Sequence, residues 1–432
     1  MRIAIVTIGT RGDVQPYLAV GAALKARGHD VVIATHDEFE PMIRARGFEH
    51  RPIVGGVREI LQTELGKKWL SSADSPREYS KYVNQIFQPL QAGFHRDIDA
   101  ALEGCDGVLF YAMAMHAIDA AERRKLPIAC LAPWPAAATA HIVPFGLPVL
   151  GAFPGFLIRW SWSALLRMMF APSNEAFQAH RAEVGLPRYP EPSPYHRIAT
   201  RKIPVVHLFS EHVIARPDDW DAHLHIAGFP FVPPSDYTPP RALSRFLEGD
   251  RLEGRECRRA TCTPTDPPIY IGFGSMTGHS AEELATLSRA AARRVGVRAV
   301  YATGWSDCKP ESDDDFHVIE EAPHDWLFPR VRAVVHHGGA GTFAAGLRAG
   351  RPTVINAFFG DQPAWGQANE RLGTGPKTLR RRGLTEEKLA DAIREAITNP
   401  TYRERATAIA ARMAAEDGAA RAAEIAERVL LA

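Results

Sequence analysis

Short apolar segments of strand character alternate with segments of helical period twice along this chain. In the first half, RIAIVTI (2–8) and HDVVIAT (29–35) flank VQPYLAVGAALKARG (14–28), in which small and apolar residues share one helical face. The alternation returns with IYIGFGS (269–275) and continues through PTVINAF (352–358). Alternation at this spacing predicts parallel sheets with helices on both faces. We therefore expect two doubly wound, Rossmann-like α/β domains, with a ligand at the carboxyl ends of the strands.

A change in composition marks the boundary between the two blocks. The segment 229–243, FPFVPPSDYTPPRAL, holds five prolines, and the polar segment 248–268 follows it. Such segments are typical of linkers and exposed loops. We predict an N-terminal domain at 1–230, a linker and exposed loop at 231–268, and a C-terminal domain at 269–432. The C-terminal helices can pack back on the first domain.

Charge and cysteine content exclude several classes of protein. The formal net charge of the 432 residues is +1, which gives no electrostatic footprint for nucleic acid. The five cysteines have irregular spacing, so we expect no disulfide framework and a reducing compartment. No carboxylate cluster suited to a metal ion is apparent. The chain opens directly on a strand pattern without a long apolar leader, so we expect a cytoplasmic protein.

The most apolar region, 142–170, is interrupted by three prolines and two arginines. A membrane-spanning helix needs about 20 predominantly apolar residues without such breaks. We expect a buried or interfacial segment instead. Its cluster of Arg159, Trp160, Trp162 and Arg167 can make a peripheral contact with a membrane surface.

The segment VVHHGGAGTFAAG (334–346) is the strongest local signal for a ligand, because a strand ends in His-His and turns on glycine into a helix. The glycines let an anion approach the backbone, and the N–H groups of Ala340, Gly341 and Thr342 point at it with the helix dipole. The Thr342 hydroxyl and the His337 imidazole add donors. This arrangement suits a diphosphate held without a metal. The alternative is a tight turn in which the glycines only permit packing.

The same turn also fits the dinucleotide fingerprint. Gly339-x-Gly341-x-x-Ala344 follows a strand, with Asp361 about twenty residues further on. However, a nicotinamide domain usually begins at its fingerprint, whereas this turn lies in the middle of a domain. Nothing in NAD binding requires the two histidines. No G-x-x-x-x-G-K-[ST] sequence is present, which excludes a P-loop ATPase.

Several motifs together resemble the family 1 nucleotide-sugar glycosyltransferases. The donor signature is APHDWLF…VVHHGGAGTFAAGLRAGRPTVINAFFGDQPAWGQ (322–367), and it is accompanied by IVTIGTRGDVQPYLAVGAALKARGHDVVIATHDEF (5–39), YIGFGSM (270–276), TGW (303–305) and MAAEDGAARA (413–422). The combination is most similar to the sterol 3β-glucosyltransferase subgroup and its bacterial relatives. The resemblance implies the GT-B fold, with two domains facing across a cleft. It also implies an inverting, metal-independent transfer from a nucleotide sugar, with no other cofactor.

The resemblance places the donor site in the second domain. His337 and the glycine turn are implied to bind the diphosphate, and Asp361 with Gln362 the sugar hydroxyls. His324 and Trp305 are implied to lie near the nucleobase or sugar. The full set is Ser275, Trp305, His324, His337, Gly339, Ala340, Gly341, Thr342, Asp361 and Gln362.

Two positions depart from the plant members of this family. Ala345 stands where they carry a ribose-binding glutamate, and Glu321 stands where they carry a tryptophan that stacks on the base. The choice between UDP and dTDP therefore stays open.

The loop GTRGDVQP (9–16) is implied to supply the base in the first domain. Many relatives have a catalytic histidine here, and Asp13 stands at that position, as in the sterol and glycopeptide-antibiotic branches. An aspartate at a helix N-terminus is also a common capping residue. The alternative bases are the histidines of this domain, namely His29, His36, His116 and His141.

The acceptor is expected to lie against Trp134, Phe145, Phe153 and Trp160, since large apolar acceptors need such walls, although an ordinary core also contains such residues. We predict transfer of glucose from UDP-glucose to a sterol or another lipophilic hydroxyl. The alternative is a natural-product glycosyltransferase that moves a UDP- or dTDP-deoxysugar to a polyketide, peptide or carotenoid. A third hypothesis is a binding protein with a degenerate site, against which the intact donor residues argue. We expect a monomer or a weak dimer.

Overall fold

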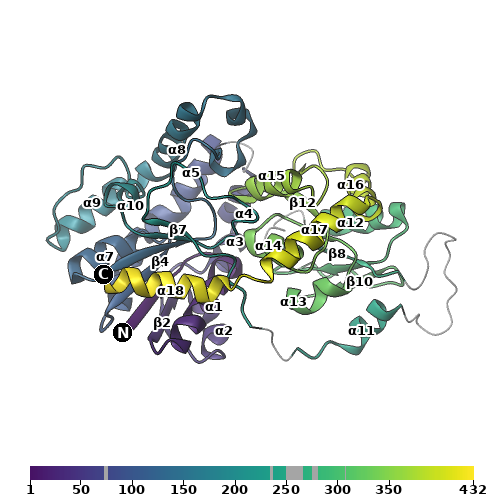
Figure 1. Ribbon diagram of the computed structural model, residues 1–432, viewed down its shortest axis with the longest axis horizontal. Coiled ribbons are helices and arrows are strands. Elements are labelled where there is room, and N and C mark those ends of the chain that lie inside the picture. The colour runs from purple at the N-terminus through teal and green to yellow at the C-terminus, as the bar shows by residue number, and fades with distance from the viewer. Residues whose placement is uncertain (73–75, 234–236, 250–265, 275–280, 307) are drawn as a thin grey trace. The chain divides into compact units, whose positions relative to one another are not determined.

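The computed structural model describes residues 1–432 except 73–75, 234–236, 250–265, 275–280 and 307. The chain divides into two units, each built on one parallel β-sheet (Figure 1). Unit 1 comprises Met1–Val232 and Glu416–Ala432, and unit 2 comprises Pro233–Ala415. The expected pair of doubly wound α/β domains is confirmed.

The sheet of unit 1 has the strand order β3-β2-β1-β4-β5-β6-β7, with all neighbours parallel. The side chains of the central strands β1 and β4 are almost completely buried, because elements cover both sheet faces. Their continuous apolar runs follow from this burial. The strands are β1 (Arg2–Val6), β2 (Asp30–Thr35), β3 (Glu49–Pro52), β4 (Gly107–Tyr111), β5 (Ile128–Ala132), β6 (Val205–His207) and β7 (Leu224–Ile226).

The helices of unit 1 include several that the sequence patterns did not predict, among them α8 in the apolar region. None of the helices in the described parts of the chain is both long and apolar enough to cross a membrane. The helices are α1 (Arg11–Ala26), α2 (Glu40–Arg44), α3 (Val57–Gln62), α4 (Glu64–Ser71), α5 (Pro76–Phe87), α6 (Gln91–Ala101), α7 (His116–Arg124), α8 (Gly155–Phe170), α9 (Asn174–Glu183), α10 (His196–Thr200) and α18 (Gly418–Leu431).

The last helix, α18, belongs to unit 1. Glu427 on this helix accepts a hydrogen bond from Arg27 Nε at 2.9 Å, and its other oxygen lies 3.1 Å from His29 Nε2. The helix begins at a close backbone contact, since a Cβ on Gly418 would lie 2.5 Å from the carbonyl carbon of Gly228. Only a residue without a side chain permits this approach.

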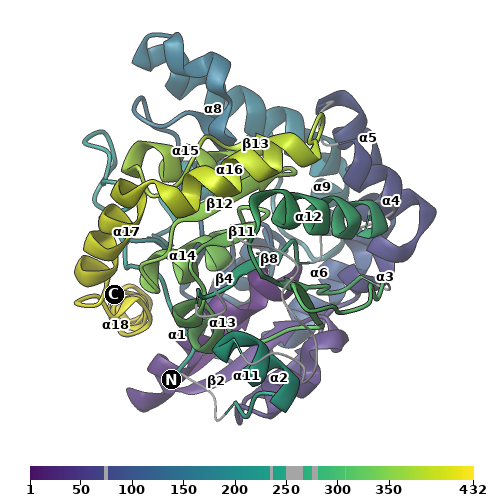
Figure 2. The same cartoon turned by 90° about the vertical axis from the view of Figure 1, so that its right-hand side faces the viewer.

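The sheet of unit 2 has the order β10-β9-β8-β11-β12-β13, again with all neighbours parallel. Figure 2 looks onto this unit and shows α12 and α16 side by side. The strands are β8 (Ile269–Gly272), β9 (Ala299–Ala302), β10 (Phe316–Ile319), β11 (Val334–His336), β12 (Thr353–Ala357) and β13 (Leu379–Arg380), and the helices are α11 (Arg241–Glu248), α12 (Ala281–Val295), α13 (His324–Leu327), α14 (Ala340–Arg348), α15 (Gln362–Leu372), α16 (Glu386–Thr398) and α17 (Pro400–Met413).

Helix α11 forms inside the segment for which the proline content predicts a linker. Leu243 and Phe246 are buried and pack with Tyr270 and Val300 in the core of unit 2. Their spacing of three residues places them on one face of the helix. The prolines 239 and 240 precede this helix rather than prevent it, because proline is tolerated where a helix begins.

A buried ion cluster joins three helices of unit 1. Asp119 on α7 has no exposed side-chain surface, and its Oδ1 accepts hydrogen bonds from Arg181 of α9 at 2.5 Å and from Arg197 of α10 at 2.6 Å. Glu122, one turn further along α7, accepts from the same two arginines at 3.0 and 2.8 Å. The charges are removed from water but compensate one another, so this part of the unit depends on keeping every partner.

We expect Asp119→Ala to lower the free energy of unfolding of unit 1 by about 3–5 kcal/mol, because it leaves buried guanidinium groups short of a counter-charge. Urea denaturation followed by circular dichroism measures this loss. The matched control is Glu424→Ala, which removes an exposed ion pair with Arg421 on α18 and should cost less than about 1 kcal/mol. Equal effects of the two variants would contradict the role assigned to the buried cluster.

Candidate functional site

The loops that follow four neighbouring strands of unit 2 meet through glycine contacts. A Cβ on Gly304, after β9, would lie 2.5 Å from the carbonyl oxygen of Gly274, after β8. A Cβ on Gly274 would lie 3.3 Å from the ring of His337, after β11. A Cβ on Gly338 would lie 3.2 Å from the backbone oxygen of Gln362, after β12. These loops therefore pack against one another and gather their side chains at the carboxyl edge of the sheet.

The glycines of the turn between β11 and α14 differ in what a side chain at each position would contact. Gly338 has φ +93°, and a Cβ there would lie 2.8 Å from Ile355 Cγ2. A Cβ on Gly339 would lie 2.5 Å from His337 Nε2. Gly341 is exposed in the first turn of α14, and a Cβ there would meet no atom of the described residues within 4 Å. Packing explains Gly338 and Gly339 but not Gly341, which borders open space.

The N-terminus of α14 offers backbone donors to this space. Gly339 precedes the helix in an extended conformation and has no side chain with which to cap it. The N–H groups of Ala340, Gly341 and Thr342 consequently have no partner within the helix. Together with the helix dipole they favour a bound anion.

The imidazole of His337 lies beside this helix terminus. Burial lowers the pKa of His337 to about 4, so the ring is neutral at pH 7. Its Nδ1 is buried and has no hydrogen-bond partner among the described residues. The neighbouring His336 points into the core, where its Nδ1 accepts a hydrogen bond from the N–H of Gly338 at 3.0 Å. Of the two histidines, His336 stabilises the turn and His337 is placed to contact an anion.

The acid–glutamine pair lies where β12 gives way to α15. Asp361 directly precedes α15, and its Oδ2 accepts a hydrogen bond from Trp365 Nε1 at 2.7 Å. Gln362 is buried, and its Oε1 accepts from the N–H groups of Phe358 at 2.8 Å and Phe359 at 3.3 Å. The amide oxygen thus holds the loop after β12. The carboxylate of Asp361 can accept from sugar hydroxyls, and the amide nitrogen of Gln362 can donate to them.

The remaining predicted donor residues are placed at the same sheet edge or lie outside the described residues. Trp305 is half-buried in the loop after β9. His324 begins α13, and its ring stacks on Phe328 with the ring centres 4.2 Å apart. The same ring meets Tyr270 of β8 edge-on at 5.9 Å. Ser275 is one of the residues that the structure does not describe.

In unit 1, Asp13 lies in the first turn of α1. The N–H and hydroxyl of Thr10, which precedes the helix, donate to Asp13 Oδ2 at 2.8 and 2.9 Å. The bond from the Thr10 N–H is one half of a capping box, in which the Thr10 side chain faces the N–H of Asp13, and the box stabilises the start of α1. A Cβ on Gly9 would lie 2.5 Å from the same oxygen, so the carboxylate needs a glycine beside it. Asp13 is therefore a capping residue, and the cap also fixes the position of its carboxylate.

The second oxygen of Asp13 is held by a residue that the sequence analysis missed. The Tyr111 hydroxyl, at the end of β4, donates to Asp13 Oδ1 at 2.9 Å. Burial raises the pKa of Asp13 above its ordinary value, while the hydrogen bonds from Thr10 and Tyr111 oppose part of that rise. A signal for Tyr111 existed in the sequence, because it is the last residue of a strand that pairs with β1 and so ends at the same sheet edge.

The histidines named as alternative bases have other contacts. His36 uses both ring nitrogens on the backbone, donating from Nδ1 at 3.1 Å and accepting at Nε2 at 3.2 Å. His116 is buried in a cluster with His95, and burial lowers the pKa of His116 to about 3. His29 faces Glu427 of α18, and His141 is exposed. Asp13, by contrast, lies in the first helical turn after β1, and both of its carboxylate oxygens are held by hydrogen bonds.

The predicted acceptor-binding residues separate into an inner and an outer group. Trp134, after β5, is buried, and the centre of its ring lies 5.4 Å from the ring centre of Tyr111, the residue that donates to Asp13. Phe145 is half-buried. Phe153 and Trp160 are exposed by 46% and 67%. The four side chains do not form one continuous buried wall.

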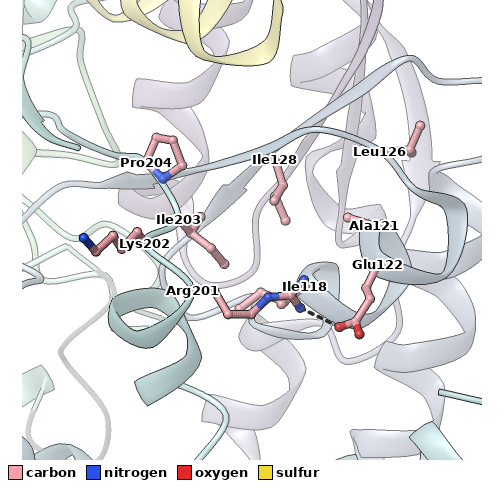
Figure 3. A pocket seen from close by; sticks show the side chains of 9 residues that line it. All are labelled: Ile118, Ala121, Glu122, Leu126, Ile128, Arg201, Lys202, Ile203 and Pro204. Atoms are coloured by element: carbon pink, nitrogen blue, oxygen red, sulfur yellow. Dashed lines mark hydrogen bonds and ion pairs between the residues drawn. The ribbon is translucent and has the colours of Figure 1, made fainter. Parts of the chain in front are cut away.

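A cavity of about 190 Å³ lies at the opposite edge of the unit 1 sheet, where β5 and β6 begin (Figure 3). The Glu122–Arg201 ion pair, at 2.5 Å, belongs to its lining. Ligands of open parallel sheets bind at the carboxyl ends of the strands, so this cavity is not the candidate site. Among the residues that the structure describes, no three histidine, cysteine, aspartate or glutamate side chains come together as a metal ion would require.

Two family models of glycosyltransferase-related domains match this chain, one in each half. The glycosyltransferase family 28 N-terminal domain matches residues 3–100, and the erythromycin biosynthesis protein CIII-like C-terminal domain matches residues 311–430. The sterol 3-beta-glucosyltransferase UGT80B1 of Arabidopsis thaliana is 31% identical over 443 residues, covering 100% of this chain and 68% of the plant protein. The chain belongs to the sterol 3-beta-glucosyltransferase family. Membership of this glycosyltransferase family decides against the dinucleotide interpretation of the glycine turn.

Other relatives within the family are much longer than this chain. The sterol 3-beta-glucosyltransferase of Neosartorya fischeri is 31% identical over 440 residues, which are 98% of this chain but 29% of the fungal protein. Solved structures share the whole GT-B architecture. The calicheamicin glycosyltransferase CalG4 aligns with a TM-score of 0.68 at 17% identity over 99% of this chain and 98% of its own. The glycosyltransferase VinC, in complex with dTDP, aligns with a TM-score of 0.65 at 18% identity over 100% of both chains.

We expect Gly341→Ala to leave the fold intact and to weaken UDP binding. Alanine is favoured over glycine in a helix by roughly 0.5–1 kcal/mol, so the melting temperature should hold or rise. The added methyl group would occupy the open space at the helix terminus, and UDP affinity measured by calorimetry should fall at least about tenfold.

The contrasting variant is Gly338→Ala, which should lower the free energy of unfolding by about 1–2 kcal/mol because of its left-handed backbone. If Gly341→Ala binds UDP as tightly as the wild type, the diphosphate does not approach this turn.

Proposed function

We propose that the protein transfers glucose from UDP-glucose to the hydroxyl of a sterol or another lipophilic alcohol, with inversion and without a metal ion. The observation that carries this proposal is the uncapped N-terminus of α14, which faces open space beside a neutral histidine at the carboxyl edge of the unit 2 sheet. The relatives named as sterol 3-beta-glucosyltransferases support the choice of sugar and acceptor.

The donor half of the site would stabilise the leaving group. As the bond between glucose C1 and the diphosphate oxygen breaks, both bonding electrons leave with UDP. The N–H groups of Ala340, Gly341 and Thr342 would receive this developing charge, and His337 would donate one hydrogen bond to it. Asp361 and Gln362 would hold the sugar hydroxyls. Because backbone dipoles and an imidazole carry the stabilisation, the proposal needs no metal.

The acceptor half would remove a proton. The acceptor oxygen attacks C1 from the face opposite the diphosphate, which inverts the configuration, and its proton passes to the carboxylate of Asp13. Oδ2 already accepts two hydrogen bonds from Thr10, so the proton would arrive at Oδ1, which accepts one from the Tyr111 hydroxyl. The pKa of Asp13, raised by burial, makes it a stronger base than an ordinary aspartate.

A natural-product glycosyltransferase using a UDP- or dTDP-deoxysugar is the second candidate. It is favoured by the match of residues 311–430 to the erythromycin biosynthesis protein CIII-like domain. Ala345, in the position of a ribose-binding glutamate in plant members, also leaves the nucleotide less constrained.

The test is a screen of UDP- and dTDP-sugars against sterols and natural-product aglycones, read by mass spectrometry in buffer with EDTA. We expect a sterol glucoside from UDP-glucose. Asp13→Asn should slow this reaction by roughly 10²–10⁴-fold, because asparagine preserves much of the cap but cannot accept the proton. Its UDP affinity and melting temperature should stay close to those of the wild type.

Three outcomes would contradict parts of this proposal. A deoxysugar product on an aglycone would favour the second candidate. Loss of activity in EDTA that Mg²⁺ restores would refute metal independence. Wild-type turnover by Asp13→Asn would leave Asp13 with its capping role alone.

We expect Tyr111→Phe to move the acid limb of the pH profile of kcat/KM to higher pH. The base acts only when ionised, so the rate falls as the pH drops through the pKa of Asp13. Tyr111 stabilises the charged form, and its loss leaves the desolvation of the carboxylate less opposed. A hydrogen bond to a charged group contributes roughly 1.5–3 kcal/mol, so a shift of about one pH unit or more is expected.

The matched control is Tyr17→Phe. The Tyr17 ring lies 5.7 Å from that of Tyr111, but its hydroxyl donates to the carbonyl of Leu131 at 3.1 Å. This variant should leave the acid limb in place. If a folded Tyr111→Phe protein has an unchanged pH profile, the acid limb does not arise from the ionisation of Asp13.

A further inference from the structure

Unit 1 carries an exposed apolar surface on and before α8. Seven large hydrophobic side chains are exposed among the described residues, and five of them lie between positions 147 and 168. Single exposed apolar residues are common on soluble proteins, but a contiguous group marks an interaction site. We call this group the outer face of α8, and it comprises Leu147, Phe153, Phe156, Trp160 and Met168.

Helix α8 is apolar on two sides, and only one of them packs on the unit. Its inner side buries Ile158, Trp162 and Leu166, and Trp162 Nε1 donates to the carbonyl of Ile142 at 2.8 Å. On the outer side, Phe156 is exposed by 71% and Trp160 by 67%. The inner side already anchors the helix on the unit, whereas the rings of Phe156 and Trp160 remain in solvent.

Both views place α8 at the periphery of unit 1, on the side away from α18 (Figures 1 and 2). Since Phe156 and Trp160 are exposed on this peripheral helix, an extended surface can reach them.

The chain segment that carries the outer face has charges of one sign. Residues 123–174 include no aspartate or glutamate, although the chain contains 50 acidic residues. Arg159 and Arg167 are both exposed on α8. Arg159 forms an ion pair with Asp219 at 3.2 Å and still exposes 56% of its side chain. Exposed aromatic rings among arginines, without nearby carboxylates on the same segment, have the composition of a surface that binds anionic lipids.

We propose that the outer face of α8 docks on the surface of an anionic lipid bilayer, with Phe156 and Trp160 inserted at the level of the headgroups. The aromatic rings supply apolar contact, and the two arginines pair with lipid phosphates while their stems lie along the apolar boundary. The docking proposal deepens the proposed function and rests on it. A sterol acceptor presents its hydroxyl at the surface of a bilayer, where the docked protein would meet it.

The test is flotation of the full chain with vesicles of phosphatidylcholine and phosphatidylserine that contain no sterol, in the absence of any nucleotide sugar. We expect the wild type to float with the vesicles, and Phe156→Ser/Met168→Ser to reduce the partition coefficient at least about tenfold. Arg159→Gln/Arg167→Gln should weaken binding at low salt and have less effect at high salt. The matched control is Leu431→Ser, which removes a side chain of 64% exposure on α18 and should bind as the wild type does.

Three results would overturn the proposal. The wild type can remain unbound, or the Phe156→Ser/Met168→Ser variant can float like the wild type. The wild type can also be a dimer that this variant dissociates, which would assign the outer face to a second copy of the chain. The vesicle assay involves no sugar transfer, so it separates the two proposals: binding without any glucoside product would refute the proposed function and leave the docking surface in place.

Discussion

The candidate donor site depends on glycines whose neighbours lie closer than a Cβ atom would readily allow. Gly304 meets Gly274, Gly274 meets the ring of His337, and Gly338 meets Ile355 and the start of α15. These contacts draw the ends of β8, β9, β11 and β12 into one edge, and they also bury the imidazole, which is why the pKa of His337 falls to about 4. Shape and electrostatics of the site therefore share one cause. The glycines carry a cost in backbone entropy, and tight packing offsets it.

In the proposed mechanism, Asp13 links the stability of unit 1 to its chemistry. The hydrogen bonds that cap α1 also hold the carboxylate against Gly9, so the group is positioned by a helix terminus rather than by a mobile loop. Tyr111, at the end of the neighbouring strand β4, donates a hydrogen bond to the second oxygen. This bond lowers the pKa of Asp13 and so opposes part of the rise caused by burial. Such double use explains why the capping and catalytic interpretations of this residue are compatible.

Unit 1 reverses the usual distribution of polar and apolar groups in one region. Arg181 and Arg197 are buried with Asp119 between α7, α9 and α10, while aromatic rings of α8 face outward. The buried charges compensate one another and fix the relative positions of the helices, and α8 packs against α10. Helix α8 is held by its inner side, and its outer side carries the exposed apolar groups.

The sequence by itself determined the fold class, the strands that end at the two sites and the glycine turn, because hydrophobic period and glycine placement are local properties of the chain. Asp13, Asp361 and Gln362 were named as candidates through the resemblance of their motifs to those of the glycosyltransferase family. Only the tertiary structure brought Tyr111 to Asp13 across 98 positions, engaged the Gln362 oxygen with the loop after β12 and packed α11 on unit 2. It alone separated the buried Trp162 from the exposed Trp160, two residues apart on one helix. These outcomes depend on contacts between residues far apart in the sequence. A local sequence pattern does not specify which partner a helix face packs against or which acceptor a hydroxyl group donates to.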